Sequence, residues 1–295
     1  MRQKQLFKLV GYDKINYSID IHVQINSKTG LSVSKISNQP KVLSLFCGGG
    51  GLDLGFKNAG FDTYLAYDID EACIKTHRYN HPEANALQAD LSRLSVGDII
   101  QEWQNRVPDQ GPIGIIGGPP CQSFSVSNVH QSDNDPRHLL PESYARILKG
   151  LNQHFNLDFF VFENVPGLIT KKHSDKFTHF KDLFIDAGFN VFEGSLNARD
   201  FGVAQDRQRV LVVGINNKKY PDIEFKFPSP TTSKYKTVRE EIGDLPEPVY
   251  FVKGLKRDQI PYHPNHWCLQ PKSDKFTNGR MKPGEIMGRS FRVLP

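Results

Sequence analysis

The chain has 295 residues, a formal net charge of +5 and a pI near 8.9, and 38% of its residues are hydrophobic. This length suits one large domain, or one domain with a smaller companion, and the mild positive charge permits a nucleic-acid partner without requiring one. No apolar run resembles a signal peptide or could cross a bilayer, so we expect a cytoplasmic protein with no membrane partner. The cysteines show no C-x-x-C pairing, which argues against a disulfide framework or a zinc ribbon; they are Cys47, Cys73, Cys121 and Cys268.

Residues 1–40 differ in character from the rest of the chain. Apolar and polar residues alternate from Ile19 to Ile25 and again from Leu31 to Val33, with the turn-forming residues 27–30 between them. This pattern predicts a β-hairpin. The hairpin would either add strands to the main domain, which we favour, or form a small accessory module.

A glycine-rich loop opens the main domain. Residues 42–46 are apolar and predict a buried strand, Cys47–Gly51 predicts a turn, and a short helix follows the turn. Glycines let a backbone approach a ligand closely, and the amides at a helix N-terminus favour polar or anionic groups. The next strand, residues 63–67, ends at Asp68, about 20 residues beyond the glycines, the spacing at which a carboxylate meets a ribose. Together the loop and the carboxylate predict an adenosine-containing ligand.

A second carboxylate follows the next predicted elements. Residues 71–79 predict a helix, and a short strand around residues 86–87 leads to Asp90. Asp90 is either a ligand-binding carboxylate or the cap of a following helix.

A cysteine at a tight turn is a candidate nucleophile. Residues 113–116 predict a short buried strand, and the Gly-Gly-Pro-Pro sequence of residues 117–120 can continue neither strand nor helix. Cys121 is therefore expected on a loop at the carboxyl end of a strand, the edge that forms the ligand crevice of an open α/β sheet. The alternative for Cys121 is a small buried apolar residue. The hydrophilic residues 127–137 predict a lid or a substrate loop.

Charged residues are also expected at later strands. The apolar residues 158–162 lead to Glu163, which would lie beside Cys121 if the two strands are neighbours. Arg207 and Arg209 enter another strand two residues apart, so their side chains share a face, where they either bind a ligand or meet solvent. The other elements predicted in this part are a helix from Glu142, a helix over residues 177–187 and strands over residues 190–196 and 210–213.

The chain beyond Asn216 is rich in lysine and proline and has little periodicity, which predicts loops or a small irregular domain. His263, His266 and Cys268 offer three ligands where a structural zinc site uses four, so we predict no metal.

Four blocks of the sequence, in this order, resemble the DNA (cytosine-5) methyltransferase family of bacterial restriction-modification type. Phe46–Gly51 is similar to its F-x-G-x-G-G cofactor loop, Pro119–Gln122 to its nucleophile loop, Glu163–Val165 to its E-N-V block and Gln205–Arg209 to its Q-x-R-x-R block. The resemblance covers residues 41–214 and is more diffuse beyond. It implies an α/β fold with a Rossmann-like S-adenosylmethionine-dependent methyltransferase sheet and helices on both faces, and then the start of a small irregular target-recognition domain.

The domains expected on this basis are three. They are an N-terminal hairpin-like extension over residues 1–40, a catalytic methyltransferase domain over residues 41–215 and a partial target-recognition region over residues 216–295.

The resemblance implies that Cys121, Glu163, Arg207 and Arg209 are the catalytic residues. Cys121 would add to carbon 6 of cytosine, so that carbon 5 can accept a methyl group. Glu163 would contact the N3 and amino edge of the base, and the two arginines would hold its O2 or the nearby backbone. A free thiol with a pKa of about 8.5 is mostly protonated near neutral pH, so the loop must lower that pKa or accept the proton.

The cofactor implied by the resemblance is S-adenosylmethionine. Asp68 stands where the family more often has glutamate, and the shorter side chain keeps the charge. The residues that the family pattern assigns to cofactor binding are Phe46, Gly48, Gly49, Gly50, Gly51, Asp68, Ile69, Asp90, Leu91 and Pro120.

The implied partner is double-stranded DNA, from which the target cytosine must be flipped out, with residues 127–137 as the closing loop. The methylation would protect DNA in a restriction-modification system. Three alternatives remain: a non-catalytic DNA-binding or regulatory module that keeps the fold, a nicotinamide-dependent oxidoreductase, and a methyltransferase acting on RNA.

Two later blocks of the family are not found in the sequence, an arginine-containing block and a closing G-N block. A split enzyme whose second subunit supplies them, a truncated reading frame and a degenerate inactive protein are the three explanations. Because the catalytic residues are intact through Arg209, we expect a split enzyme or a truncation.

Overall fold

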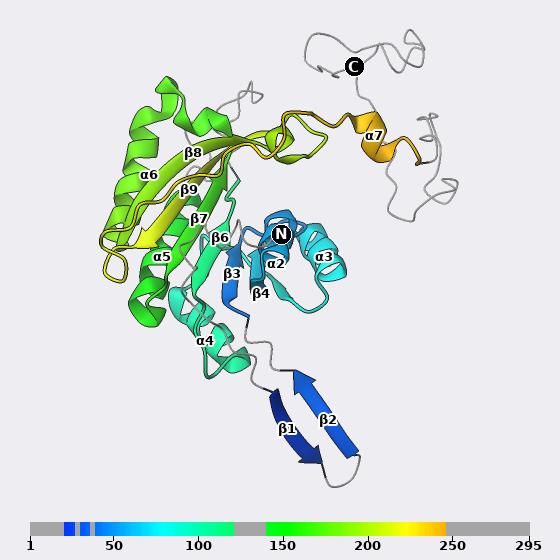
Figure 1. Cartoon of the computed structure of the whole chain (residues 1–295). Coiled ribbons are helices and arrows are strands. Elements are labelled where there is room, and N and C mark those ends of the chain that lie inside the picture. The colour runs from blue at the N-terminus through cyan, green and yellow to red at the C-terminus, as the bar shows by residue number, and fades with distance from the viewer. Residues whose placement is uncertain (1–20, 27–29, 36–38, 121–139, 246–295) are drawn as a thin grey trace, which may run out of the picture. The chain divides into compact units, whose positions relative to one another are not determined.

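The computed structural model describes residues 21–26, 30–35, 39–120 and 140–245. By its internal contacts the chain divides into two compact units. The first comprises Met1–Ala198 and Arg207–Thr231, and the second comprises Arg199–Asp206 and Thr232–Pro295. The helices and strands are labelled in Figure 1.

The N-terminal segment forms the hairpin that its alternating pattern predicts. Strands β1 (Ile21–Asn26) and β2 (Gly30–Lys35) pair antiparallel, with Val23 opposite Val33. They form a two-stranded sheet of their own, so the favoured expectation that they add strands to the main sheet is wrong.

A seven-stranded sheet forms the centre of the first unit. In space the strands follow the order β5-β4-β3-β6-β7-β9-β8, and β3 to β7 run parallel while β9 runs antiparallel to both of its neighbours. The order reverses between β3 and β6, and in open α/β sheets ligands bind at the carboxyl ends of the strands at such a switch point. The strands are β3 (Lys41–Leu45), β4 (Asp62–Asp68), β5 (Asn85–Gln88), β6 (Gly114–Gly117), β7 (Phe159–Asn164), β8 (Phe189–Asn197) and β9 (Gln208–Asn216).

Helices cover both faces of the sheet, as predicted (Figure 1). On one face the helices α4 (Val96–Arg106), α5 (Leu140–Phe155) and α6 (Ser174–Asp186) pack on Leu43, Leu45 and Phe160. On the other face α2 (Gly51–Asn58) packs on Val42 and Phe159, and α3 (Glu71–Asn80) contributes Ile74 to a cluster with Ala66 and Ala86. Alternate residues of β3 therefore belong to opposite faces, because successive side chains of a strand point in opposite directions.

Helix α4 was not predicted as an element, and its N-terminus shows whether Asp90 is a helix cap. The Ser95 side chain caps this helix by accepting a hydrogen bond from the Asp98 amide, and Ile99 and Trp103 are its buried residues. Asp90 instead accepts hydrogen bonds from the amide and the hydroxyl of Ser92. Asp90 is thus not the cap of α4, and its carboxylate holds the turn that precedes the helix.

The segment that follows β9 completes the second face without a helix. Tyr220, Ile223, Phe225 and Phe227 pack against the cluster that contains Phe159 and the residues of α2, so the first unit extends to Thr231. In the second unit, the short helix α7 (Val238–Ile242) has a capping box between Thr237 and Glu240. The boundaries predicted for the three domains stay predictions. None of the helices in the described ranges has the length and apolar character needed to cross a membrane.

Candidate active site

The glycine loop after β3 adopts a conformation that few residues allow. Phe46, Gly48 and Gly50 all have positive φ angles, of 54°, 54° and 87°. A left-handed Phe46 is uncommon, and such residues concentrate where the surrounding structure imposes the conformation. At Gly50 a side chain would also collide with the ring of His81. The loop therefore depends on glycine for both its backbone shape and the space beneath it.

Helix α2 begins directly after this loop, with Gly50 as its N-cap. The amides of a first helical turn have no partner within the helix, and the helix dipole makes this end electropositive. Gly51 and Leu52 of this first turn line the same cavity as Gly117 at the end of β6, so polar groups of a ligand can bind there.

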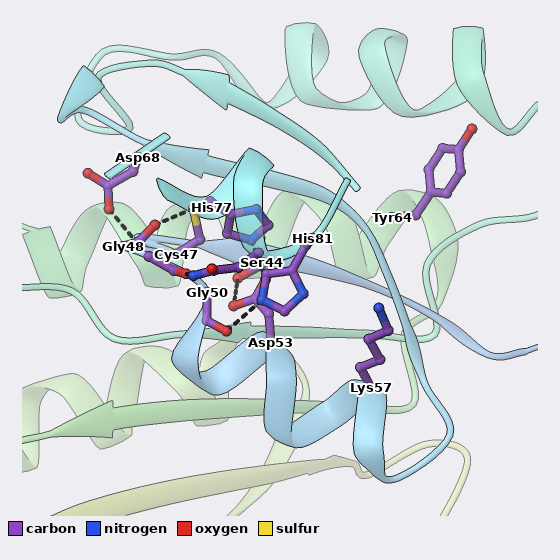
Figure 2. A network of polar contacts seen from close by, with 12 residues as sticks. Ser44, Cys47, Gly48, Gly50, Asp53, Lys57, Tyr64, Asp68, His77 and His81 are labelled. Atoms are coloured by element: carbon purple, nitrogen blue, oxygen red, sulfur yellow. Dashed lines mark hydrogen bonds and ion pairs between the residues drawn. The ribbon is translucent and has the colours of Figure 1, made fainter. Parts of the chain in front are cut away.

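Asp68 joins the end of β4 to the glycine loop. Its Oδ2 accepts a hydrogen bond from the Gly48 amide at 2.9 Å (Figure 2). Its Oδ1 accepts one from the Asp70 amide at 2.9 Å. Each carboxylate oxygen can accept a second hydrogen bond, so Asp68 keeps the capacity to bind ligand hydroxyls. The carboxylate predicted from its spacing thus also holds the loop in place.

Ile69 and Asp90, two other predicted cofactor residues, follow β4 and β5 at the carboxyl edge of the sheet, whereas the side chain of Leu91 packs in the core. Ile69 is 61% exposed, which leaves its apolar surface open to a flat ligand. Asp90 is partly exposed, and the hydrogen bond from the Ser92 hydroxyl lowers the pKa of its carboxyl group. Leu91 is 2% exposed and packs in the main core, so only its backbone could meet a cofactor.

An ion pair joins two of the predicted catalytic residues. Glu163 lies near the end of β7 and Arg209 near the start of β9, and these strands are antiparallel neighbours. The Arg209 Nε lies 2.8 Å from the Glu163 Oε1, and both side chains are about three-quarters buried. Arg207 precedes β9, where its amide donates a hydrogen bond to the Asn197 side chain at 3.1 Å.

Asn164 connects β7 to the loop that leads to Cys121. This residue is 3% exposed, and its Nδ2 donates a hydrogen bond to the Pro119 carbonyl at 3.4 Å. Its Oδ1 accepts one from the Val165 amide at 2.8 Å. Of the predicted nucleophile loop, the described part ends at Pro120, which is exposed, and Cys121 lies outside the described residues, as does the predicted lid over residues 127–137.

One cavity of about 340 Å³ is lined by residues from both predicted groups, the cofactor-binding residues and the catalytic residues. The glycine loop forms one wall, and Glu163 and Arg207 belong to another, with Gly117 and Gly118 between them at the start of the nucleophile loop. Its lining residues are Ser44, Phe46, Cys47, Gly51, Leu52, Asp53, Gly117, Gly118, Glu163 and Arg207.

Two polar side chains that line the cavity were missed by the sequence analysis, those of Ser44 and Asp53. Ser44 is 1% exposed and Asp53 is fully buried. Asp53 and Phe56 are the buried residues of α2 and lie three positions apart, on the same face of the helix. The sequence therefore did contain a signal for Asp53, because an acidic residue at an apolar position of an amphipathic helix indicates a buried carboxylate.

The cysteine inside the glycine loop is not equipped to be a nucleophile. Burial raises the pKa of the Cys47 thiol well above its usual range, and the nearby charges of Asp53 and Asp68 raise it further. Because the thiolate is the reactive form, Cys47 stays an inert thiol. The 39–120 and 140–245 ranges contain no group of three or more His, Cys, Asp and Glu side chains that could hold a metal ion.

The strand order, with a glycine loop after β3 and a carboxylate at the end of β4, defines the Rossmann-like fold of S-adenosylmethionine-dependent methyltransferases, as predicted. The pattern of the family described as C-5 cytosine-specific DNA methylase matches residues 40–283, and the chain belongs to this family.

Individual relatives agree with this assignment. The type II methyltransferase M.MthTI of Methanothermobacter thermautotrophicus is 39% identical over 209 residues, which cover 70% of this chain and 57% of that protein. M.FnuDI of Fusobacterium nucleatum is 41% identical over 206 residues, 70% of this chain and 55% of that protein. The chain thus spans a little over half the length of these relatives.

A solved structure shows the same fold. It is a protein encoded within a prophage, from E. coli, and is described as a DNA modification methyltransferase. The two structures superpose with a TM-score of 0.58 and 31% sequence identity, over 71% of this chain and 56% of the other.

Proposed function

We propose that this protein transfers a methyl group from S-adenosylmethionine to carbon 5 of cytosine in double-stranded DNA, through a covalent adduct of Cys121 at carbon 6. The observation that carries the proposal is the shared cavity, which the glycine loop, the start of the nucleophile loop and Glu163 all line. A role in a restriction-modification system, and hence a cytoplasmic location on bacterial DNA, is supported by the names of the type II relatives.

The residues at the glycine loop fit the proposed cofactor. The loop allows close backbone approach, Asp68 retains acceptor capacity for hydroxyls, and Ile69 offers an exposed apolar face. The cofactor, when bound, supplies an electrophilic methyl group. The roles of Phe46, Asp90 and the backbone of Leu91 at this site are part of the same proposal.

Cys121 makes carbon 5 reactive. Carbon 5 of cytosine is a poor nucleophile, and the bond from the Cys121 sulfur to carbon 6 shifts the electrons of the ring towards carbon 5 and N3. Once carbon 5 carries the methyl group, a base removes the carbon 5 proton. The electron pair then returns to the ring and the carbon 6–sulfur bond breaks, which restores Cys121.

Glu163 positions and stabilises the base during the addition. Arg209 holds its Oε1, while Oε2 lies towards Gly118 at the start of the nucleophile loop. The Oε2 side is therefore the one available to the N3 and amino edge of cytosine, and a proton carried on Oε2 is donated to N3, which offsets the negative charge that develops there. Arg207, which lines the same cavity, supplies a cation for the base O2 or the nearby backbone.

Trapping of the covalent adduct tests the catalytic proposal. DNA that contains 5-fluorocytosine in place of cytosine cannot release the cysteine, because fluorine replaces the hydrogen that must leave. With S-adenosylmethionine present, the wild-type chain should form a DNA adduct that resists denaturation. The Cys121→Ser variant should form none, and Cys73→Ser, a substitution outside the cavity, should react normally. No adduct in the wild type, even with a candidate second subunit added, would contradict the proposal.

We also propose a second polypeptide as a partner, one that carries the arginine-containing and G-N blocks of the family. Such a partner would complete the surface that reads the DNA sequence. Adduct formation should then require, or be strongly accelerated by, the product of an adjacent reading frame that encodes these blocks. A full adduct yield with the present chain alone would remove the need for this partner.

A further inference from the structure

A buried carboxylate lies beneath the glycine loop, in the floor of the cavity. Asp53 stands in the first turn of α2 and is fully buried. The Ser44 hydroxyl donates a hydrogen bond to its Oδ2 at 3.1 Å, and the His77 Nε2 lies 3.0 Å from its Oδ1 (Figure 2). Ser44 and Asp53 both line the cavity. None of these contacts is used by the mechanism above.

The surroundings favour an ionised Asp53. Its two oxygens accept hydrogen bonds, and the first turn of a helix stabilises a negative charge. His77 is fully buried, and its Nδ1 has no hydrogen-bond partner among the described residues. A proton on Nε2 satisfies Asp53, whereas a second proton on Nδ1 would bury an unpaired N–H group. We therefore expect a neutral His77, which leaves the charge of Asp53 uncompensated by the ring.

A second carboxylate lies on the other side of the same loop. Asp68 binds the Gly48 amide, so Asp53 and Asp68 flank residues 47–51. The charges of both carboxylates, in addition to burial, raise the pKa of the Cys47 thiol in that loop. Both charges thus act on the same wall of the cavity. Glu163, across the cavity, is paired with Arg209, while Arg207 adds a positive charge on that far side.

We propose that Asp53 is a specificity-determining residue, which makes the cavity bind the positively charged methyl donor more tightly than the product of the transfer. The inference rests on the proposed function, in which S-adenosylmethionine is the donor. The donor is a sulfonium cation, and loss of its methyl group leaves S-adenosylhomocysteine, whose sulfur is a neutral thioether. A nearby carboxylate therefore attracts the charged sulfur of the donor but not the neutral sulfur of the product. Such a preference would assist release of the product after each transfer.

The test compares the affinities of the two ligands rather than activity. Calorimetric titration of the full chain with S-adenosylmethionine and with S-adenosylhomocysteine gives the ratio of the two dissociation constants. For Asp53→Asn, which keeps the size and one acceptor, the preference for the donor should fall about fivefold, as expected when one unit charge is removed from the wall of a cavity that is open to water. Ser44→Ala and His77→Gln are the controls, because both keep the Asp53 carboxylate. Even if both affinities fall, the ratio of the two dissociation constants should stay within about twofold of wild type, which is smaller than the roughly fivefold change expected when the charge is removed.

The outcomes separate the two proposals. An unchanged ratio in Asp53→Asn, with both ligands bound by the wild type, would mean that Asp53 only supports the fold, and the inference would be wrong while the proposed function stands. A wild type that binds neither ligand would overturn the cofactor assignment and this inference together. If Asp53→Asn does not fold, the double variant Asp53→Asn/His77→Gln pairs two neutral amides without the charge, because a glutamine amide has the reach of the His77 Nε2, and it should show the same loss of preference.

Discussion

Substitution of Gly118 by alanine should slow catalysis while the fold survives. A Cβ atom at this position would lie 2.8 Å from the Glu163 Oε2. Ordinary van der Waals contact begins near 3.4 Å, so the oxygen must retreat by about 0.6 Å. The carboxylate cannot move freely, because its other oxygen is bound by Arg209 at 2.8 Å. Oε2 is the atom that we place against the cytosine ring.

We expect Gly118→Ala to lower the rate of the reaction and to leave the free energy of unfolding nearly unchanged. A misplacement of this size in a group that contacts the reacting base lowers the rate by roughly 10- to 100-fold. The free energy of unfolding should change by less than about 1 kcal/mol, because alanine also restricts the unfolded chain and the clash involves the end of a side chain. The assay is the rate of adduct formation with 5-fluorocytosine DNA, and urea denaturation reports stability.

Gly55→Ala is the matched control. A Cβ at Gly55 meets no atom within 4 Å, and the residue lies in the middle of α2. This variant should react at the wild-type rate and gain about 0.5–1 kcal/mol in stability, because alanine is the better helix former. A Gly118→Ala protein that forms the adduct at the wild-type rate would refute the placement of Glu163 against the base.

Three further predictions concern stability. Because burial raises the pKa of the Cys47 thiol in the folded state, its contribution to stability is complete below the ordinary thiol pKa of about 8.5 and is lost progressively above it. Above that pH the free energy of unfolding should fall by about 1.4 kcal/mol per pH unit, and Cys47→Ala should remove this fall from urea denaturation at pH 8 to 10. Asn216→Ala should cost about 2–3 kcal/mol in urea denaturation, because the Asn216 side chain is buried and donates to the Leu157 carbonyl at 2.7 Å; a cost below about 0.5 kcal/mol would contradict the importance of this bond. Gly214→Ala should lower stability by about 1–3 kcal/mol or more, measured by thermal unfolding, since a Cβ there would collide with the buried ring of Phe160.

Much of the fold could be predicted because it rests on local patterns. The hairpin strands alternate, the strands of the parallel sheet are continuous apolar runs, and glycine or proline residues mark the turns between them. Helix α4 escaped prediction although Ser95 caps it and Ile99 and Trp103 share its buried face. Its apolar positions are few, so the signal was weak compared with that of α5.

Some features of the candidate site could likewise be predicted from the sequence, and others could not. Glu163, Arg207, Arg209 and Asp68 could be named from their positions at strand ends and from the blocks around them. The pairing of Glu163 with Arg209 could not, because it requires β9 to insert antiparallel beside β7. No local pattern specifies which strands of a sheet become neighbours.

By itself, the sequence determined the order of strands, turns and helices, and the residue types that stand at the strand ends, because backbone preferences and apolar periodicity act over a few residues. The tertiary structure alone decided which of those residues share a cavity and what lies beneath it. Asp53 and His77 are far apart in the chain, and only the packing of α2 beside α3 joins them under the glycine loop. Because the protein interior has a lower dielectric constant than water, their charges and hydrogen bonds are stronger there than those of the same residues would be on the surface.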